Sequence, residues 1–109
     1  MIKLRGEVWW VNFDPSVGQE IKKRRPAVIL SNNISNKHLD RYQVVPLSSQ
    51  LKKVYPSETI VKIDGKNSKA MIDQLTTVSE LRFVSKIAVL SQSDIASIEK
   101  VIKTQLNLE

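Results

Sequence analysis

The sequence contains no cysteine and only one histidine, His38. Without cysteine the chain forms no disulfide, thiolate metal site or thiol nucleophile, and this composition fits a reducing compartment. A single histidine excludes acid–base catalysis by two histidines of one chain, and it argues against a histidine-rich metal site. We therefore expect a protein that works without a metal or a cofactor.

Long apolar runs are also absent. No run approaches the roughly 18 residues that a membrane-spanning helix needs. Residues 1–6, MIKLRG, are too short and too charged for a signal peptide. The 109 residues predict a single domain, residues 1–109. We expect a cytoplasmic protein with no membrane association.

Positive charge is what the chain has in excess. It carries 17 lysines and arginines against 11 acidic residues, which gives a formal net charge of +6. Such a balance favours an anionic partner, such as RNA, DNA or an acidic peptide, and it speeds encounters with that partner. Charge alone does not choose among these three.

Short segments rich in β-branched and aromatic residues predict about six strands. In the first strand, Trp9, Val11 and Phe13 alternate with Val8 and Trp10, so the two sets lie on opposite faces. The predicted strands are residues 7–13, 27–30, 42–47 and 58–63, an extended stretch at 69–78, and residues 86–90.

Residues 91–108 predict an amphipathic C-terminal helix. Ser91 is a suitable N-cap, and Asp94 suits the positive end of the helix. One apolar stripe at helical spacing comprises Ile95, Ile98, Val101, Ile102 and Leu106. The pattern as a whole predicts an α+β, mainly β fold, in which a small, strongly curved antiparallel sheet or barrel packs beside this helix. Pro46 suggests an edge or a bulge near the end of its strand.

The segment 14–24 is long for a hairpin loop, and loops of this length are often functional. It contains Gly18 and leads into the four consecutive cations of residues 22–25. The apolar run 27–30 follows directly and predicts a buried strand. A polar loop that delivers Arg25 to the start of a rigid strand is a plausible phosphate-handling site.

Arginines, hydroxyls and carboxylates are the groups that this sequence offers for catalysis, and they suit RNA cleavage by its own 2′-hydroxyl. Arg25 can neutralise the charge that develops on the phosphate. Ser48 can donate a hydrogen bond to that phosphate, and Glu20 can accept the proton of the 2′-hydroxyl. The same residues also fit a solvated basic surface, a turn serine and a surface ion pair. Composition and spacing alone favour a basic RNA-binding module.

Several short motifs follow one another along the chain. They are residues 5–9 (RGEVW), Asp14-Pro15, Gly18, Glu20, residues 25–28 (RPAV), Ser31-Asn32, residues 45–49 (VPLSS), residues 73–78 (DQLTTV) and residues 86–90 (KIAVL) before the helix. In this order they resemble the MazF/PemK family of bacterial toxin endoribonucleases. The resemblance extends over nearly the whole chain.

This resemblance implies a compact SH3-like barrel with a C-terminal helix that works as a homodimer. It implies metal-independent cleavage of single-stranded RNA at short sequence motifs, which leaves a 2′,3′-cyclic phosphate and a 5′-hydroxyl and stops translation and growth. Arg25 matches the family's catalytic arginine, Ser48 its catalytic threonine or serine, and Glu20 a loop glutamate. The implied partner is a cognate antitoxin whose acidic C-terminal segment occupies the RNA groove.

The residues expected to bind RNA come from the loop, its charge run and the third motif. They are Gly18, Gln19, Lys22, Lys23, Arg24, Ser49, Asp73 and Gln74. Thr76 departs from the family pattern, because many members have arginine there. Two other functions fit the same fold: a non-catalytic RNA-binding module, and a gyrase-targeting toxin like CcdB.

Overall fold

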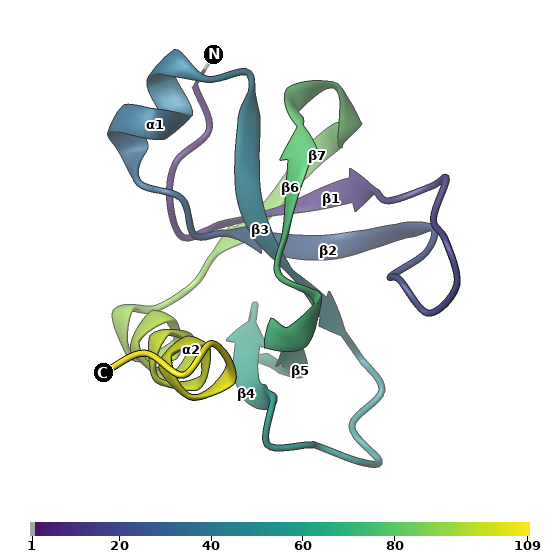
Figure 1. Ribbon diagram of the computed structural model, residues 1–109, viewed down its shortest axis with the longest axis vertical. Coiled ribbons are helices and arrows are strands. Elements are labelled where there is room, and N and C mark those ends of the chain that lie inside the picture. The colour runs from purple at the N-terminus through teal and green to yellow at the C-terminus, as the bar shows by residue number, and fades with distance from the viewer. Residues whose placement is uncertain (1) are drawn as a thin grey trace.

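The computed structural model describes residues 2–109, which form seven strands, two α-helices and two 3₁₀ turns (Figure 1). In chain order the elements are β1 Glu7–Asn12, β2 Arg24–Ile29, α1 Asn33–His38, β3 Arg41–Ser48, β4 Glu58–Ile63, β5 Lys66–Met71, η1 Ile72–Gln74, β6 Thr76–Ser79, η2 Glu80–Arg82, β7 Phe83–Val89 and α2 Gln92–Gln105.

All strands belong to one sheet, and every pair of neighbours is antiparallel. The strand order is β4-β5-β3-β2-β1-β7, and β6 pairs separately with β3. β3 is central, because its first half pairs with β6 and its last two residues pair with β5. This change of partner curls the sheet into a half-barrel with α2 beside β4 (Figure 1). The predicted mainly-β fold with a C-terminal helix is confirmed.

Both faces of the sheet are covered by side chains. One core cluster includes Val28 and Leu47 and packs against Ile98 of α2. The other lies on the opposite face and includes Ala27 and Ile29. Because consecutive residues of β2 point into different clusters, the strand needs a continuous apolar run, as the sequence predicted. Its residues 27–29 are fully buried.

The C-terminal helix begins as predicted. The backbone N–H of Asp94 donates to the Ser91 hydroxyl over 3.1 Å, so Ser91 is the N-cap. Ile95 and Ile98 are buried in the core. The helix ends at Gln105, three residues earlier than expected, and Asn107 adopts a left-handed φ of 56° beyond its end.

Two details of the sheet differ from the sequence prediction. The stretch 69–78 is not one strand, because the 3₁₀ turn η1 separates β5 from β6. Pro46 does not mark an edge, since β3 lies inside the sheet. Val44 pairs with Thr76 of β6 and Leu47 pairs with Ala70 of β5, so Pro46 falls between the two partners, where no strand needs its missing N–H.

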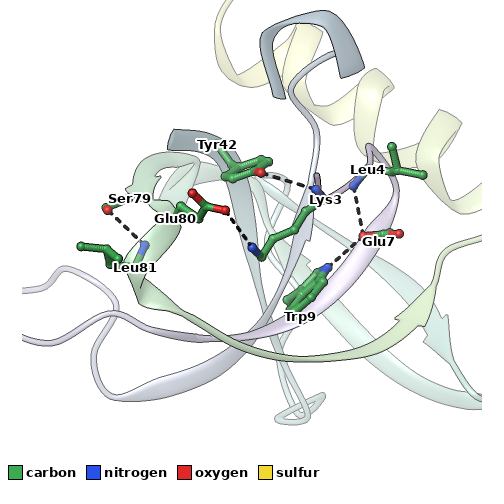
Figure 2. Close-up of polar contacts among 8 residues, drawn as sticks. All are labelled: Lys3, Leu4, Glu7, Trp9, Tyr42, Ser79, Glu80 and Leu81. Atoms are coloured by element: carbon green, nitrogen blue, oxygen red, sulfur yellow. Dashed lines mark hydrogen bonds and ion pairs between the residues drawn. The ribbon is translucent and has the colours of Figure 1, made fainter. Parts of the chain in front are cut away.

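The N-terminal segment packs across β1, with Lys3 at the centre of an aromatic cluster (Figure 2). The Lys3 ammonium lies 5.0 Å from the Trp9 ring centroid, 5.7 Å from that of Tyr42 and 5.2 Å from that of Phe83. It also pairs with Glu80 at 3.5 Å. These contacts fix the segment that precedes β1.

None of the helices formed by residues 2–109 has the length and apolar character needed to cross a membrane.

Candidate active site

A pocket of about 580 Å³ lies where β2 begins, β3 ends and β4 turns into β5. It gathers four of the predicted site residues from two separate motifs: Arg24 and Arg25, and Ser48 and Ser49. The complete lining is Trp10, Arg24, Arg25, Pro26, Leu47, Ser48, Ser49, Ile63, Asp64, Lys66, Asn67, Ser68 and Ile87. This pocket is the candidate active site.

The register between β2 and β3 brings Arg25 and Ser48 to the same place. Ala27 pairs with Pro46, and counting two residues outward along each strand reaches Arg25 and Ser48. The pairing of β2 with β3 ends at Ala27 and Pro46, and beyond it Ser48 pairs only on the other side of β3, with Lys69 of β5. The two strand ends therefore separate, and the pocket lies between them.

Arg25 is half-buried, and its guanidinium is only lightly engaged. Its Nε donates to the Lys22 carbonyl over 3.3 Å. Within residues 2–109 no carboxylate forms an ion pair with it. The outer N–H groups are therefore not committed to a carboxylate within those residues, which suits bidentate binding of a phosphate.

Ser48 is almost fully buried, and both its side chain and its backbone carbonyl are hydrogen-bonded. Its hydroxyl oxygen accepts from the Gln50 N–H over 3.1 Å. Its carbonyl accepts from the Ser68 hydroxyl over 2.9 Å. Within residues 2–109 the hydroxyl proton of Ser48 has no acceptor, so this side chain can donate to a phosphate oxygen from a fixed position.

A buried ion pair supports the backbone just beyond Ser48. Lys69 Nζ lies 3.4 Å from Glu58 Oε1, and both side chains are about nine-tenths buried. Lys69 also donates to the Lys53 carbonyl over 3.0 Å, and Glu58 accepts from the Tyr55 N–H over 2.9 Å. The pair thus ties the connection between β3 and β4 to β5. No local pattern of residues indicated this ion pair.

Glu20, Asp73 and Gln74 lie together in a different pocket of about 370 Å³, beneath the β1–β2 loop. The Glu20 carboxylate accepts from the Val17 N–H over 2.8 Å, so it closes a turn of its own loop. It does not line the pocket that holds Arg25 and Ser48. The predicted catalytic set is therefore brought together only in part.

Gln74 holds the β1–β2 loop in place. Its side-chain oxygen accepts from the Ile21 N–H over 3.2 Å, and its side-chain nitrogen donates to the Gln19 carbonyl over 3.4 Å. Gly18 sits at φ 59° on this loop, in the left-handed region that suits glycine. Lys22 and Lys23 are exposed on the loop and line neither pocket.

The other nine lining residues were not predicted as site residues from the sequence. Among them, Trp10 and Ile87 come from β1 and β7, and Asp64, Lys66 and Asn67 come from the β4–β5 hairpin. The alternation of the first strand had placed Trp10 on the face opposite Trp9. The hairpin's approach to Arg25 had no local indication, because it depends on how β3 changes partners.

Among residues 2–109 there is no cluster of three or more histidine and acidic side chains placed to hold a metal ion.

Residues 4–106 match the family model of the PemK-like, MazF-like toxins of type II toxin–antitoxin systems. The chain belongs to this family. The resemblance predicted from the order of the motifs is thereby confirmed. Endoribonuclease MazF9 of Mycobacterium tuberculosis is 31% identical over 113 residues, which cover 95% of this chain and 96% of that protein.

Solved structures share the fold. MazF of Deinococcus radiodurans superposes with a TM-score of 0.87 at 24% identity and covers 99% of both chains. A mycobacterial endoribonuclease, solved in complex with its cognate antitoxin, superposes with a TM-score of 0.82 at 18% identity. That likeness covers 98% of this chain and 97% of the other.

Proposed function

We propose that this chain is a toxin endoribonuclease that cleaves single-stranded RNA at specific sequences, without a metal, and so inhibits translation and growth. The observation that carries the proposal is the meeting of Arg25 and Ser48 in one pocket. Membership in the toxin family and the name of the mycobacterial relative support it. The working unit would be a cytoplasmic homodimer of this single domain.

The reaction begins when the RNA's 2′-oxygen attacks the adjacent phosphorus. A base removes the 2′-hydroxyl proton, the bond from phosphorus to the 5′-oxygen breaks, and that oxygen takes up a proton. The products are a 2′,3′-cyclic phosphate and a 5′-hydroxyl. Arg25 stabilises the extra negative charge on phosphorus and protonates the leaving oxygen, while Ser48 donates to a non-bridging oxygen.

Glu20 remains the predicted base. In this structure its carboxylate is engaged by the Val17 N–H, and it lines the neighbouring pocket. To accept the 2′-hydroxyl proton, Glu20 must therefore move toward the phosphate held by Arg25 and Ser48 when RNA binds. Asp73 and Gln74 lie in that same neighbouring pocket, so an RNA strand that crosses both pockets would contact all three residues.

The exposed cations beside Arg25 would supply affinity for the RNA backbone. Lys22, Lys23 and Arg24 follow one another on the surface, and phosphate contacts of this kind bind RNA independently of its sequence. The same positive surface suits the acidic segment of an antitoxin, and a structural neighbour is solved with its cognate antitoxin. We therefore expect the antitoxin to compete with RNA for this region.

The decisive experiment is incubation of the purified protein with single-stranded RNA in the presence of EDTA, followed by mapping of the product ends. Cyclic phosphate and 5′-hydroxyl ends at a recurring sequence are expected. A substrate with one 2′-deoxy sugar at the cut site should resist cleavage, because it has no nucleophile. Cutting of that substrate, or loss of activity with EDTA, would contradict the mechanism.

Two other outcomes would assign a different function. RNA binding without any cleavage would indicate a non-catalytic binding module. No effect on RNA together with inhibition of DNA gyrase would indicate a CcdB-like toxin.

A further inference from the structure

The candidate active site has two unlike kinds of lining residue. The apolar ones, called here the apolar wall, are Trp10, Pro26, Leu47, Ile63 and Ile87. The charged and polar ones include Arg25 and Ser48. A volume of about 580 Å³ falls within the range of roughly 300–1,000 Å³ typical of small-molecule sites. The pocket therefore suits a ligand that has both a flat apolar part and an anionic part.

Trp10 is the large aromatic residue on the apolar wall. Its side chain is 39% exposed, although β1 runs between two other strands. Trp9, the neighbouring tryptophan, points to the opposite face and packs edge-on against Phe83 with ring centroids 6.0 Å apart. Trp9 thus serves the core, whereas the indole of Trp10 is available to a ligand.

The hairpin between β4 and β5 supplies a polar rim to this pocket. Its two-residue turn has positive φ at both Asp64 (49°) and Gly65 (79°), which is the conformation that Asp-Gly favours in tight hairpins. Lys62 donates its N–H to the Asp94 carboxylate of α2 over 2.9 Å, which anchors the hairpin. The backbone of this rim is therefore held in place before any ligand arrives.

The side chains on this rim are free to bind. Among residues 2–109, those of Asp64, Lys66 and Asn67 form no hydrogen bond and no ion pair. Asn67 presents both a donor and an acceptor in one plane, which matches the edge of a nucleobase. A carboxylate at Asp64 accepts from exocyclic amino groups but would repel an acidic peptide.

We propose that this pocket binds the nucleobase of the nucleotide adjoining the scissile phosphate, with Trp10 as its stacking platform and the Asp64–Asn67 rim as the reader of its edge. This inference rests on the proposed function, since Arg25 and Ser48 hold the phosphate of the same RNA. Single-stranded bases stack on aromatic side chains and are read along their exposed edges.

Tryptophan fluorescence tests the stacking directly. The probe is a short single-stranded RNA that contains the mapped cleavage sequence, with one 2′-deoxy sugar at the cut site so that it is bound but not cleaved. Binding should quench the emission of the wild-type protein and of Trp9→Phe, which keeps Trp10. Quenching should disappear in Trp10→Leu, which keeps an apolar side chain. Equal quenching in Trp10→Leu would overturn the proposal.

An abasic probe separates stacking from a structural effect of the substitution. Removal of the base next to the cut site should weaken binding by the wild-type protein by roughly 5- to 150-fold. Trp10→Leu should lose a similar factor on the intact probe but almost nothing more on the abasic one. If the loss of affinity from Trp10→Leu and the loss from removing the base multiply when the two are combined, the indole does not contact that base. That result would overturn the proposal.

The rim is tested by sequence preference. Asn67→Ala should relax the preference for one base beside the cut site, so that the preferred RNA and RNAs altered at that base are cleaved with more similar efficiency. If Asn67→Ala keeps the wild-type preference for that base, the rim does not read the base. Quenching of Trp10 by an acidic antitoxin peptide but not by the RNA probe would instead assign the pocket to the antitoxin. If the wild-type protein cleaves no RNA, the proposed function fails; if it cleaves but Trp10→Leu behaves like the wild type, only this inference fails.

Discussion

Arg25 differs from the three cations that precede it, although the four look alike in the sequence. Lys22, Lys23 and Arg24 are exposed, whereas Arg25 is half-buried at the start of β2. The difference follows from Pro26 and the apolar run after it. Residues 27–29 form the buried part of β2, so Arg25 is the cation that lies closest to it. Sequence reasoning could identify Arg25 for this reason, since the strand start was visible in the residues themselves.

Arg25→Ala should lower the cleavage rate by about 10²–10³-fold, the usual cost of removing one preorganised donor to a developing charge. RNA binding should fall much less, because the neighbouring cations remain. Initial rates and affinities on the same RNA measure the two effects. Arg41→Ala is the matched control, since Arg41 is an exposed arginine at the far end of β3. If the two variants cleave RNA at equal rates, Arg25 does not stabilise the developing charge and another residue must do so.

Glu7 is a buried carboxylate whose ionisation contributes to stability. Burial alone would raise its pKa, but the Glu7 carboxylate accepts hydrogen bonds from the Leu4 N–H and the Trp9 indole (Figure 2). These bonds, together with the Lys86 ammonium at 3.0 Å, outweigh the effect of burial. The pKa of Glu7 is therefore lowered from its ordinary value of 4.5. A carboxylate with a lowered folded-state pKa stabilises the fold above its unfolded pKa, and this stabilisation is lost as the pH falls through the folded value.

Glu7→Gln should reduce the free energy of unfolding at neutral pH by about 1–3 kcal/mol, since it removes a charged acceptor. The difference from the wild type should shrink as the pH falls below 4.5. Urea denaturation at several pH values between neutral and about pH 3 measures it. Glu99→Gln, which alters a half-exposed pair with Arg5, should show little effect. A difference that stays constant over this range would show that the Glu7 charge is not the cause.

At the scale of elements, the sequence predicted best where one local pattern decides the structure. The cap at Ser91 and the apolar stripe defined α2, and the alternation around Trp9 assigned both faces of β1. It predicted least well where the structure of a segment depends on which other strand the segment pairs with. Thr76 and its neighbours pair with β3 only because η1 turns the chain back toward that strand. Pro46 is tolerated inside the sheet because β3 exchanges β6 for β5 there.

The β1–β2 loop, residues 13–23, owes its position to Gln74. Gln74→Ala removes both side-chain hydrogen bonds to the loop backbone, each worth about 1 kcal/mol. We expect faster hydrogen exchange at the Ile21 amide, with exchange in the core strands unchanged. The control is Gln43→Ala, which removes a glutamine bond to Thr77 on another part of the sheet. Unchanged exchange at Ile21 would mean that other contacts hold the loop.

At the scale of the whole molecule, the site combines motifs that the sequence identified with a hairpin that it could not. Arg25 and Ser48 belong to recognisable motifs, one just before a predicted strand and the other just after one. Asp64 and Asn67 reach the same pocket only because β3 exchanges β6 for β5, which brings the β4–β5 hairpin to its end. The curl depends on the packing of both faces and of α2, so no short segment of sequence encodes it.

The net charge of +6 is also a property of the whole molecule, but only charges that contact RNA should govern binding. For single strands, the slope of log affinity against log salt is about −0.7 for each phosphate contact. The double variant Lys22→Gln/Lys23→Gln should therefore reduce the magnitude of that slope by up to about 1.4. Affinity should fall by a similar factor for every RNA sequence.

The matched control is Lys100→Gln/Lys103→Gln, which removes the same charge from exposed positions on α2. If the loop cations contact the backbone, this control should keep the wild-type slope. Titrations of an uncleavable RNA at several salt concentrations distinguish the two variants. Equal slopes in both double variants would mean that net charge alone attracts the RNA, and that the run beside Arg25 is no more than part of a basic surface.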